Sequence, residues 1–132
     1  MIELTKLTKR FAQHTAVDNL SFQVAPGEVL GFLGPNGAGK STTMKMLTGF
    51  LEPTAGTARV FGRDIRRETI AVQRQIGYLP EGAPCYGDMS VRAFLDFIAQ
   101  VRGYRGAEQV RRVDRVLSEL ELVAEQRQSI ET

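Results

Sequence analysis

Two segments within the first 24 residues alternate between apolar and polar positions, which is the pattern of half-buried strands. The alternation runs through Ile2 to Leu7 and returns through Leu20 to Val24, with a polar turn region around Gln13 to Thr15. A period of two places the apolar side chains on one face of a strand, and burial of one face is typical of antiparallel sheets. We therefore predict an antiparallel β portion at the start of the chain.

Two other segments are apolar without alternation. Glu28 to Leu33 follows the turn signal Pro26-Gly27, and Ile76 to Leu79 ends at Pro80. Short continuous apolar runs bounded by Gly and Pro are typical of strands buried on both faces of a parallel sheet. Both segments are predicted to be strands of a parallel core, and Thr57 to Phe61 is predicted to be a further strand.

The remaining apolar positions follow helical spacing. Thr42 to Leu51 is predicted to be a helix that follows a glycine-rich segment and ends near Gly49 and Pro53. Ser90, a favourable N-cap residue, precedes a second predicted helix, and Gly103 separates it from a third. The apolar positions of these two helices, which we expect to pack on each other, are Val91, Phe94, Leu95, Ile98, Val110, Val113, Leu117 and Leu120. Strands mixed with helices predict an α/β fold.

Composition and charge exclude several classes of protein. The 132 residues include 17 Lys plus Arg and 15 Asp plus Glu, which leaves a net charge of +2, and 42% of the residues are hydrophobic. This balance is typical of a globular domain and argues against disorder and against a dedicated nucleic-acid binder. No apolar run approaches the roughly 20 residues that span a bilayer, and the N-terminus lacks the features of a secretory signal.

The chain has too few cysteines and histidines for an internal disulfide or a metal site built from them. The single Cys85 has no internal disulfide partner, and with the single His14 it cannot form a metal site, so we assign both to structural roles in a reduced, cytoplasmic compartment. A local excess of arginines is compatible with an acidic or lipid headgroup partner, but a solvated face is the favoured interpretation. These arginines are Arg59, Arg63, Arg66, Arg67 and Arg74.

The glycine-rich segment carries the strongest functional signal. It fits the phosphate-loop motif G-x-x-x-x-G-K-[ST] at every required position and lies between a predicted strand and a predicted helix. Glycines allow successive backbone N–H groups to turn toward an anion, and the following helix adds its positive N-terminal dipole. The motif residues are Gly34, Pro35, Asn36, Gly37, Ala38, Gly39, Lys40 and Ser41.

Each polar residue at the end of the motif has a chemical role toward a nucleotide. Lys40 can reach the β- and γ-phosphates as a point charge, Ser41 can ligate Mg²⁺, and Thr42 can reach the region of the α-phosphate. The position two after Gly34 is Asn36, so the segment is not the G-x-G-x-x-G motif of dinucleotide-binding proteins. The sequence therefore predicts binding of a nucleoside triphosphate with Mg²⁺.

With this loop, the chain resembles the nucleotide-binding subunits of ABC (ATP-binding cassette) transporters. Four further segments fall in the order and spacing of that family, and the resemblance covers essentially the whole chain. The segment Tyr78-Leu79-Pro80-Glu81 is most similar to the corresponding segment of cassettes that serve ABC-2 type exporters. The four segments are Val17 to Phe22, Pro26 to Glu28, Pro53 to Gly56 and Ile76 to Glu81.

The resemblance assigns roles to two residues outside the loop. Phe11 lies at the position of the aromatic residue that stacks on adenine, where Tyr is more usual; the alternative is a core residue of the first sheet. Glu81 stands where the family has a Gln that contacts Mg²⁺ or the attacking water, and its alternative is a solvated acid in a loop. The resemblance thus implies Lys40 and Glu81 as catalytic residues and Ser41 and Glu81 as metal ligands.

The family also implies an architecture and partners. The chain is expected to be the N-terminal part of one ATP-binding domain of the P-loop NTPase class, with the β portion and phosphate-loop core in residues 1–82 and a helical subdomain in 83–132. ATP and Mg²⁺ are the implied cofactors. The implied partners are a transmembrane permease and a second cassette, with which the chain would form a homodimer; no nucleic-acid partner is expected. The protein is expected on the cytoplasmic face of the membrane, which it would contact only through the permease.

Other motifs of the family are absent from this sequence. Its signature Leu-Ser-Gly-Gly-Gln, the Walker B acid with the following Glu, and the switch His are expected C-terminal to Thr132, so this fragment alone is not expected to hydrolyse ATP. A non-transport ABC ATPase that acts on ribosomes or DNA is the alternative function. A P-loop kinase is a second alternative, and the pattern from Phe11 to Glu81 argues against it.

Overall fold

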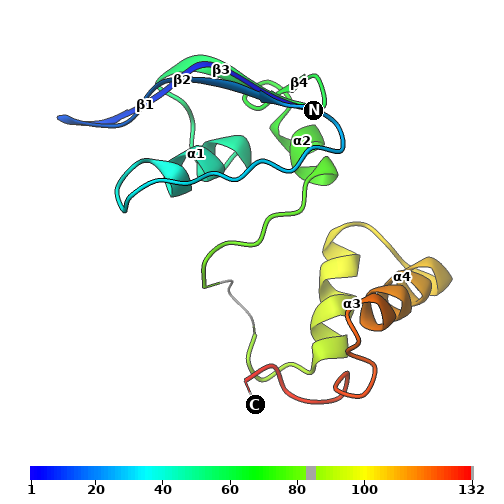
Figure 1. Ribbon diagram of the computed structural model, residues 1–132. Helices are drawn as coiled ribbons and strands as arrows, with labels where there is room; N and C mark the ends of the chain where they lie inside the picture. The colour runs from blue at the N-terminus through cyan, green and yellow to red at the C-terminus, as the bar shows by residue number, and fades with distance from the viewer. Residues whose placement is uncertain (83–85, 132) are drawn as a thin grey trace. The chain divides into compact units, whose positions relative to one another are not determined.

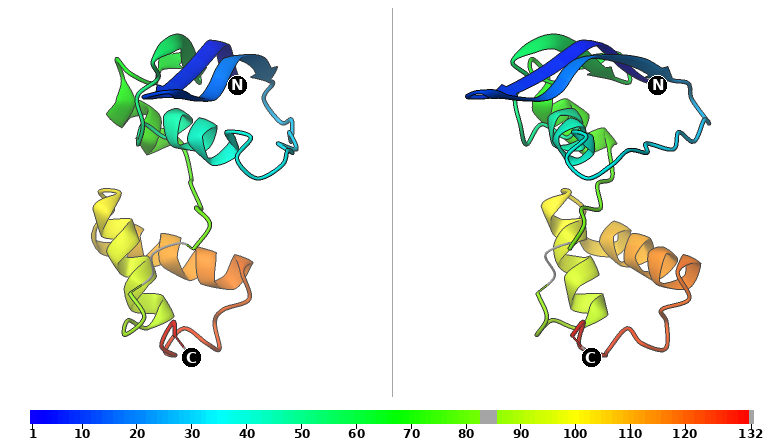
Figure 2. Two further views of the ribbon diagram at one scale, coloured as in Figure 1. Left: turned by 90° about the vertical axis from the view of Figure 1, so that its left-hand side faces the viewer. Right: turned by 60° about the vertical axis from the view of Figure 1, so that its left-hand side comes forward.

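The computed structural model describes residues 1–82 and 86–131, which form two compact units, Met1–Tyr78 and Leu79–Thr132. The first unit is a four-stranded sheet, coloured blue to green in Figure 1. Helices α1 (Lys40–Leu47) and α2 (Thr69–Gln75) lie on one of its faces, as the views of Figure 2 also show. The sheet order is β2-β1-β3-β4, and every pairing is antiparallel, which confirms the predicted antiparallel portion. The strands are β1 (Ile2–Phe11), β2 (His14–Val24), β3 (Ala55–Val60) and β4 (Arg63–Asp64).

The β1–β2 hairpin is longer than the sequence predicted and contains irregular positions. Its register shifts three times, between Leu4 and Arg10 on β1. Side-chain hydroxyls take over backbone hydrogen bonds near these shifts: the amide of Lys6 donates to Ser21 Oγ at 2.8 Å, and the amide of Asn19 donates to Thr8 Oγ1 at 3.0 Å. Because these backbone donors remain satisfied, the hairpin continues as one ribbon to its tight turn after Phe11.

The core of the first unit anchors helix α1 (Lys40–Leu47) to the sheet. Met46 on α1 and Leu7 on β1 are completely buried in it. Burial of such a side chain contributes about 1.5–3 kcal/mol, so the core fixes the helix that follows the phosphate loop. The core residues are Leu4, Leu7, Val17, Met46, Leu47, Ala58, Val60, Ile65 and Val72.

The two predicted parallel strands are not strands in the structure. Glu28–Leu33 and Ile76–Leu79 have no regular secondary structure, and Val29, Leu33 and Leu79 are 96%, 93% and 85% exposed. An inner strand requires neighbouring strands that pair with its N–H and C=O groups, and neither segment belongs to a strand ladder among the described residues. The prediction that these two segments are strands was therefore wrong for the described residues, whereas the antiparallel sheet and the α/β class are confirmed.

The helices of the first unit also differ from the prediction. Helix α1 begins at Lys40 and ends at Leu47 rather than Leu51, because Gly49 adopts a positive φ of 75°. A second helix, α2 (Thr69–Gln75), lies where no helix was predicted, and it buries Val72. Asp64 stabilises the turn before α2 by accepting hydrogen bonds from the amides of Arg66 and Arg67. Burial raises the pKa of this carboxyl, but these hydrogen bonds and the charges of the two arginines lower the pKa below its ordinary value.

The second unit contains the two predicted helices, α3 (Val91–Val101) and α4 (Gly106–Glu119). The predicted N-cap is present, since Ser90 Oγ accepts a hydrogen bond from the amide of Ala93 at 3.2 Å. The helices pack on each other, as predicted, through a small core of Ala99, Val113 and Leu117, of which Ala99 was not among the predicted positions. Three of the predicted apolar positions are exposed instead: Ile98, Val110 and Leu120. No helix in residues 1–82 and 86–131 has both the length and the apolar character needed to cross a bilayer.

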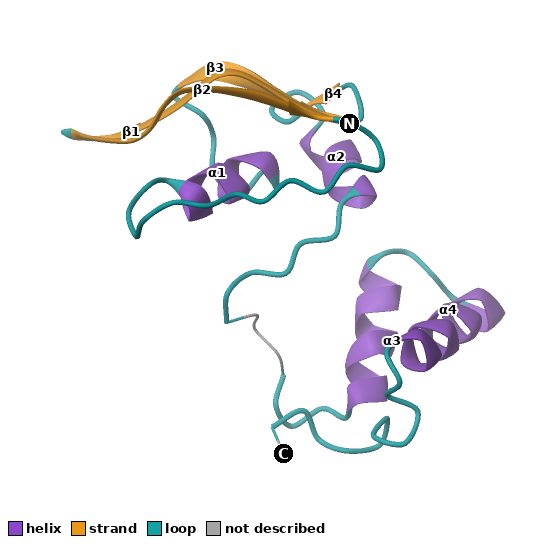
Figure 3. Ribbon diagram, viewed as in Figure 1, coloured by secondary structure: helices purple, strands orange, loops and turns teal. Residues whose placement is uncertain are grey.

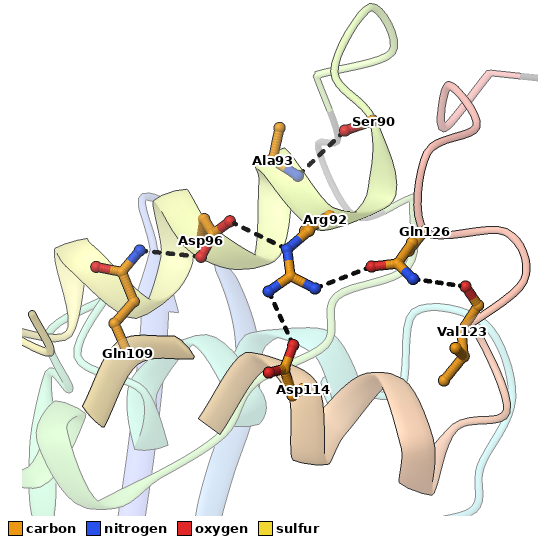
Figure 4. Close-up of polar contacts among 8 residues, drawn as sticks. All are labelled: Ser90, Arg92, Ala93, Asp96, Gln109, Asp114, Val123 and Gln126. Atoms are coloured by element: carbon orange, nitrogen blue, oxygen red, sulfur yellow. Dashed lines mark hydrogen bonds and ion pairs between the residues drawn. The ribbon is translucent and has the colours of Figure 1, made fainter. Parts of the chain in front are cut away.

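Arg92 joins three segments of the second unit (Figure 4). Its guanidinium lies 2.8 Å from Asp114 Oδ1 on α4 and donates to Gln126 Oε1 at 2.9 Å, while its Nε lies 3.9 Å from Asp96 Oδ2 on α3 itself. The side chain of Gln126 in turn donates to the carbonyl of Val123 at 2.8 Å. One cation therefore holds the chain after α4 against both helices.

We expect Arg92→Met to lower the free energy of unfolding of the second unit by about 1–2 kcal/mol, because it leaves Asp114 and Gln126 without their partner at a partly exposed site. Thermal unfolding followed by the helical circular dichroism signal measures the change. Arg111→Met on α4 is the matched control, since no described residue forms a hydrogen bond or ion pair with the Arg111 side chain. Equal unfolding temperatures for the two variants would contradict the role of Arg92.

Candidate functional site

The phosphate loop runs directly into helix α1, as Figure 3 shows where the teal loop meets the purple helix. Gly37 and Gly39 adopt positive φ values of 84° and 83°, which glycine reaches without steric cost. The amide of Ala38 donates to the carbonyl of Pro35 at 3.2 Å and closes the turn between them. The loop therefore has the curled backbone that the sequence predicted, followed by the positive end of a helix.

Gly39 is where the loop contacts the sheet. It is buried, and a Cβ at this position would lie 2.2 Å from the carbonyl oxygen of Ala16 and 2.9 Å from Val17 Cγ2 on β2. Only glycine allows this approach of backbone to backbone. The contact sets the end of the loop against β2 within three residues of the hairpin turn.

Lys40 folds back over the loop that precedes it. Its Nζ donates a hydrogen bond to the carbonyl of Gly34 and another, at 2.7 Å, to the carbonyl of Pro35. The ammonium group is thus held beside the backbone that the motif assigns to phosphate binding. A compact cation in this place suits a β- or γ-phosphate.

The first turn of α1 presents backbone donors to the same region. Gly39 is its N-cap residue and supplies no side-chain hydrogen bond, so the first amides of the helix have no side-chain cap. Ser41 is exposed and Thr42 is half-buried, which leaves both side chains within reach of a ligand. Thr43, which the sequence reasoning missed, is buried, and its Oγ1 donates to the carbonyl of Gly39 at 2.9 Å. This bond fixes the junction of loop and helix.

Phe11 is the last residue of β1 and pairs with His14 across the hairpin turn. Its side chain is 45% exposed, so it is not the buried core residue that was the alternative interpretation. The Nζ of Lys9 lies 5.2 Å from the centroid of the ring. The ring thus lies on the hairpin whose second strand contacts Gly39, and stacking on adenine stays a prediction.

The structure does not test the role of Glu81. Glu81 belongs to the second unit and is exposed, and its contact with Mg²⁺ or water stays a prediction. Cys85 lies outside the described residues. His14 is exposed at the start of β2. Among residues 1–82 and 86–131, no cluster of three or more His, Cys, Asp or Glu side chains could hold a metal ion.

Comparison with known proteins decides the family. A family model described as ABC transporter matches residues 17–132, which include the whole phosphate loop, most of the first unit and all of the second. The chain belongs to the ABC transporter family. The resemblance that the sequence motifs indicated is thereby confirmed.

Two relatives illustrate this membership. The chain is 41% identical over 116 residues to a probable multidrug ABC transporter ATP-binding protein, YbhF, of Escherichia coli (strain K12), covering 88% of the chain and 20% of that protein. It is 42% identical over 107 residues to a Nod factor export ATP-binding protein I of Paraburkholderia xenovorans, covering 81% of the chain and 35% of that protein. The chain therefore spans a fifth to about a third of the length of these relatives.

Solved structures show the same fold. The ATP-binding subunit of an ABC transporter matches with a TM-score of 0.83 and 29% identity, over 97% of the chain and 53% of the solved chain. CbiO1 from Clostridium perfringens, part of the ABC transporter complex cbiONQ, matches with a TM-score of 0.82 and 23% identity, and covers the same shares. The chain spans about half the length of these cassettes.

Replacing Gly39 tests the contact between the loop and β2. Gly39→Ala introduces both a strained positive φ and a clash with Ala16, whereas Gly37→Ala introduces the same strain where a Cβ meets nothing within 4 Å. We expect Gly37→Ala to cost about 1–2 kcal/mol of stability and Gly39→Ala at least about 1 kcal/mol more. Urea unfolding of the two variants measures the difference. Equal losses would show that the approach to β2 is not tight.

Proposed function

We propose that the chain binds ATP together with Mg²⁺ at the phosphate loop. The observation that carries the proposal is the placement of the Lys40 ammonium group against the carbonyls of Gly34 and Pro35, directly before the uncapped first turn of α1. Backbone donors, a helix N-terminus and a cation converge on one small region. Few ligands other than a phosphate chain require all three.

In this proposal each residue of the site contacts a different part of the nucleotide. The amides of the loop bind the α- and β-phosphates, and Lys40 moves from the loop carbonyls to the β- and γ-phosphates. Ser41 ligates Mg²⁺ through its hydroxyl, and Thr42 contacts the region of the α-phosphate. Phe11 stacks on the adenine from the end of β1. Glu81 contacts Mg²⁺ or the attacking water.

When bound, Mg²⁺ would supply positive charge beside the phosphates. The residues of this chain suit that role in their donor chemistry, because a hydroxyl and a carboxylate are oxygen ligands of the kind that Mg²⁺ prefers. Ser41 is exposed at the start of α1, so its hydroxyl is free to turn toward a bound ion. Lys40 and Mg²⁺ together offset the charge of the triphosphate.

We infer that the protein as a whole couples ATP hydrolysis to transport. The two relatives described above are named as a multidrug transporter ATP-binding protein and as an export ATP-binding protein, and CbiO1 is part of a transporter complex. A permease subunit, a second cassette and a place at the cytoplasmic face of the membrane follow from this proposal. We assign hydrolysis to the assembled cassettes rather than to this chain alone. None of these names supports action on ribosomes or DNA.

Isothermal titration of Mg-ATP into the chain tests nucleotide binding. We expect saturable binding that Lys40→Ala weakens by about 10- to 100-fold, which corresponds to the loss of a charge-assisted hydrogen bond to phosphate. Lys45→Ala is the matched control, because Lys45 is an exposed lysine in the last turn of the same helix. Equal affinities for the two variants, or no saturable binding by the unmodified chain, would contradict the proposal.

A further inference from the structure

Lys9 and Phe11 lie two residues apart at the end of β1, so they share one face of the strand. The Nζ of Lys9 lies 5.2 Å from the centroid of the Phe11 ring, within the range of a cation–π interaction. The ammonium group thus covers one face of the ring. The ring remains 45% exposed, which leaves surface for a second contact.

The same ammonium group is fastened to the chain that follows helix α1. Lys9 Nζ donates a hydrogen bond of 2.7 Å to the carbonyl of Glu52, and the side chain of Lys9 is half-buried. Two further bonds join these segments: the amide of Thr54 donates to the carbonyl of Thr8 at 2.9 Å, and the amide of Arg10 donates to Thr54 Oγ1 at 3.1 Å. The segment that follows helix α1 therefore holds the Lys9 side chain in place.

We propose that Lys9 is a positioning residue that fixes the Phe11 ring for stacking on the adenine of ATP. Phe11 ends its strand at the hairpin turn, where little else restrains an exposed ring. The bond to Glu52 sets the place of the ammonium group, and the cation–π contact then sets the orientation of the ring and occupies one of its faces. The base stacks on the opposite face. This role rests on the proposed binding of ATP.

Lys9→Met tests the role, because it keeps most of the apolar stem of the side chain and removes the ammonium group, with its charge and its hydrogen bond to Glu52. Isothermal titration compares Mg-ATP, which carries a base, with Mg-tripolyphosphate, which carries none. We expect Lys9→Met to weaken Mg-ATP binding by about threefold to fivefold beyond any loss for Mg-tripolyphosphate. Lys9→Arg, which retains a cation, is expected to restore the preference for Mg-ATP.

Arg10→Met is the matched control for charge alone. Arg10 is the neighbouring exposed cation, and no described residue forms a hydrogen bond or ion pair with its guanidinium. We expect this variant to weaken both ligands equally. A second comparison uses Phe11→Leu: once the ring is gone, the further change Lys9→Met is expected to weaken Mg-ATP no more than it weakens Mg-tripolyphosphate.

Three results would overturn the proposal. An equal loss for Mg-ATP and Mg-tripolyphosphate would mean that Lys9 acts only through its charge. The same loss from Lys9→Met with and without Phe11 would mean that it acts independently of the ring. If Phe11→Leu leaves the affinity for Mg-ATP unchanged, the Phe11 ring does not stack on the adenine. Failure of the unmodified chain to bind either ligand is a separate result, which overturns the proposed function and this inference with it.

Discussion

Gly39 allows the backbone of the phosphate loop to touch the backbone of β2, and the geometry of the site depends on that contact. A side chain at this position would occupy the space of the Ala16 carbonyl. The loop ends at Gly39, in contact with β2, and the next residue, Lys40, starts helix α1. Burial of Met46 in the core then holds the helix from its other end. A nucleotide site made of backbone donors requires such a fixed frame, since the donors themselves have no side chains to adjust.

The sequence predicted those parts of the fold that local interactions determine. The alternation in β1 and β2, the Ser90 cap of α3 and the apolar stripe with Val113 and Leu117 all depend on residues close together in the chain, and the structure contains each of them. The motif from Gly34 to Ser41 was likewise recognisable, because its spacing reflects the path of the backbone around a phosphate chain.

The predictions that failed depend on partners distant in sequence. Glu28–Leu33 has the composition of an inner strand, but a strand forms only beside another strand, and this segment belongs to no strand ladder among the described residues. Helix α2 was missed because its seven residues carry one buried apolar side chain, Val72, which is too weak a periodic signal. The bond from Lys9 to Glu52 spans 43 positions, and nothing in the sequence pattern indicated it.

Amide hydrogen exchange with and without Mg-ATP shows whether the amides of the phosphate loop bind the phosphates of ATP. We expect slower exchange confined to peptides that cover Gly34 to Thr43 and the end of β1, while the peptide from Gly106 to Glu119 in α4 stays unchanged, because bound phosphate oxygens accept hydrogen bonds from the loop amides. Unchanged exchange in the loop at saturating Mg-ATP, or protection centred on α4, would contradict the account.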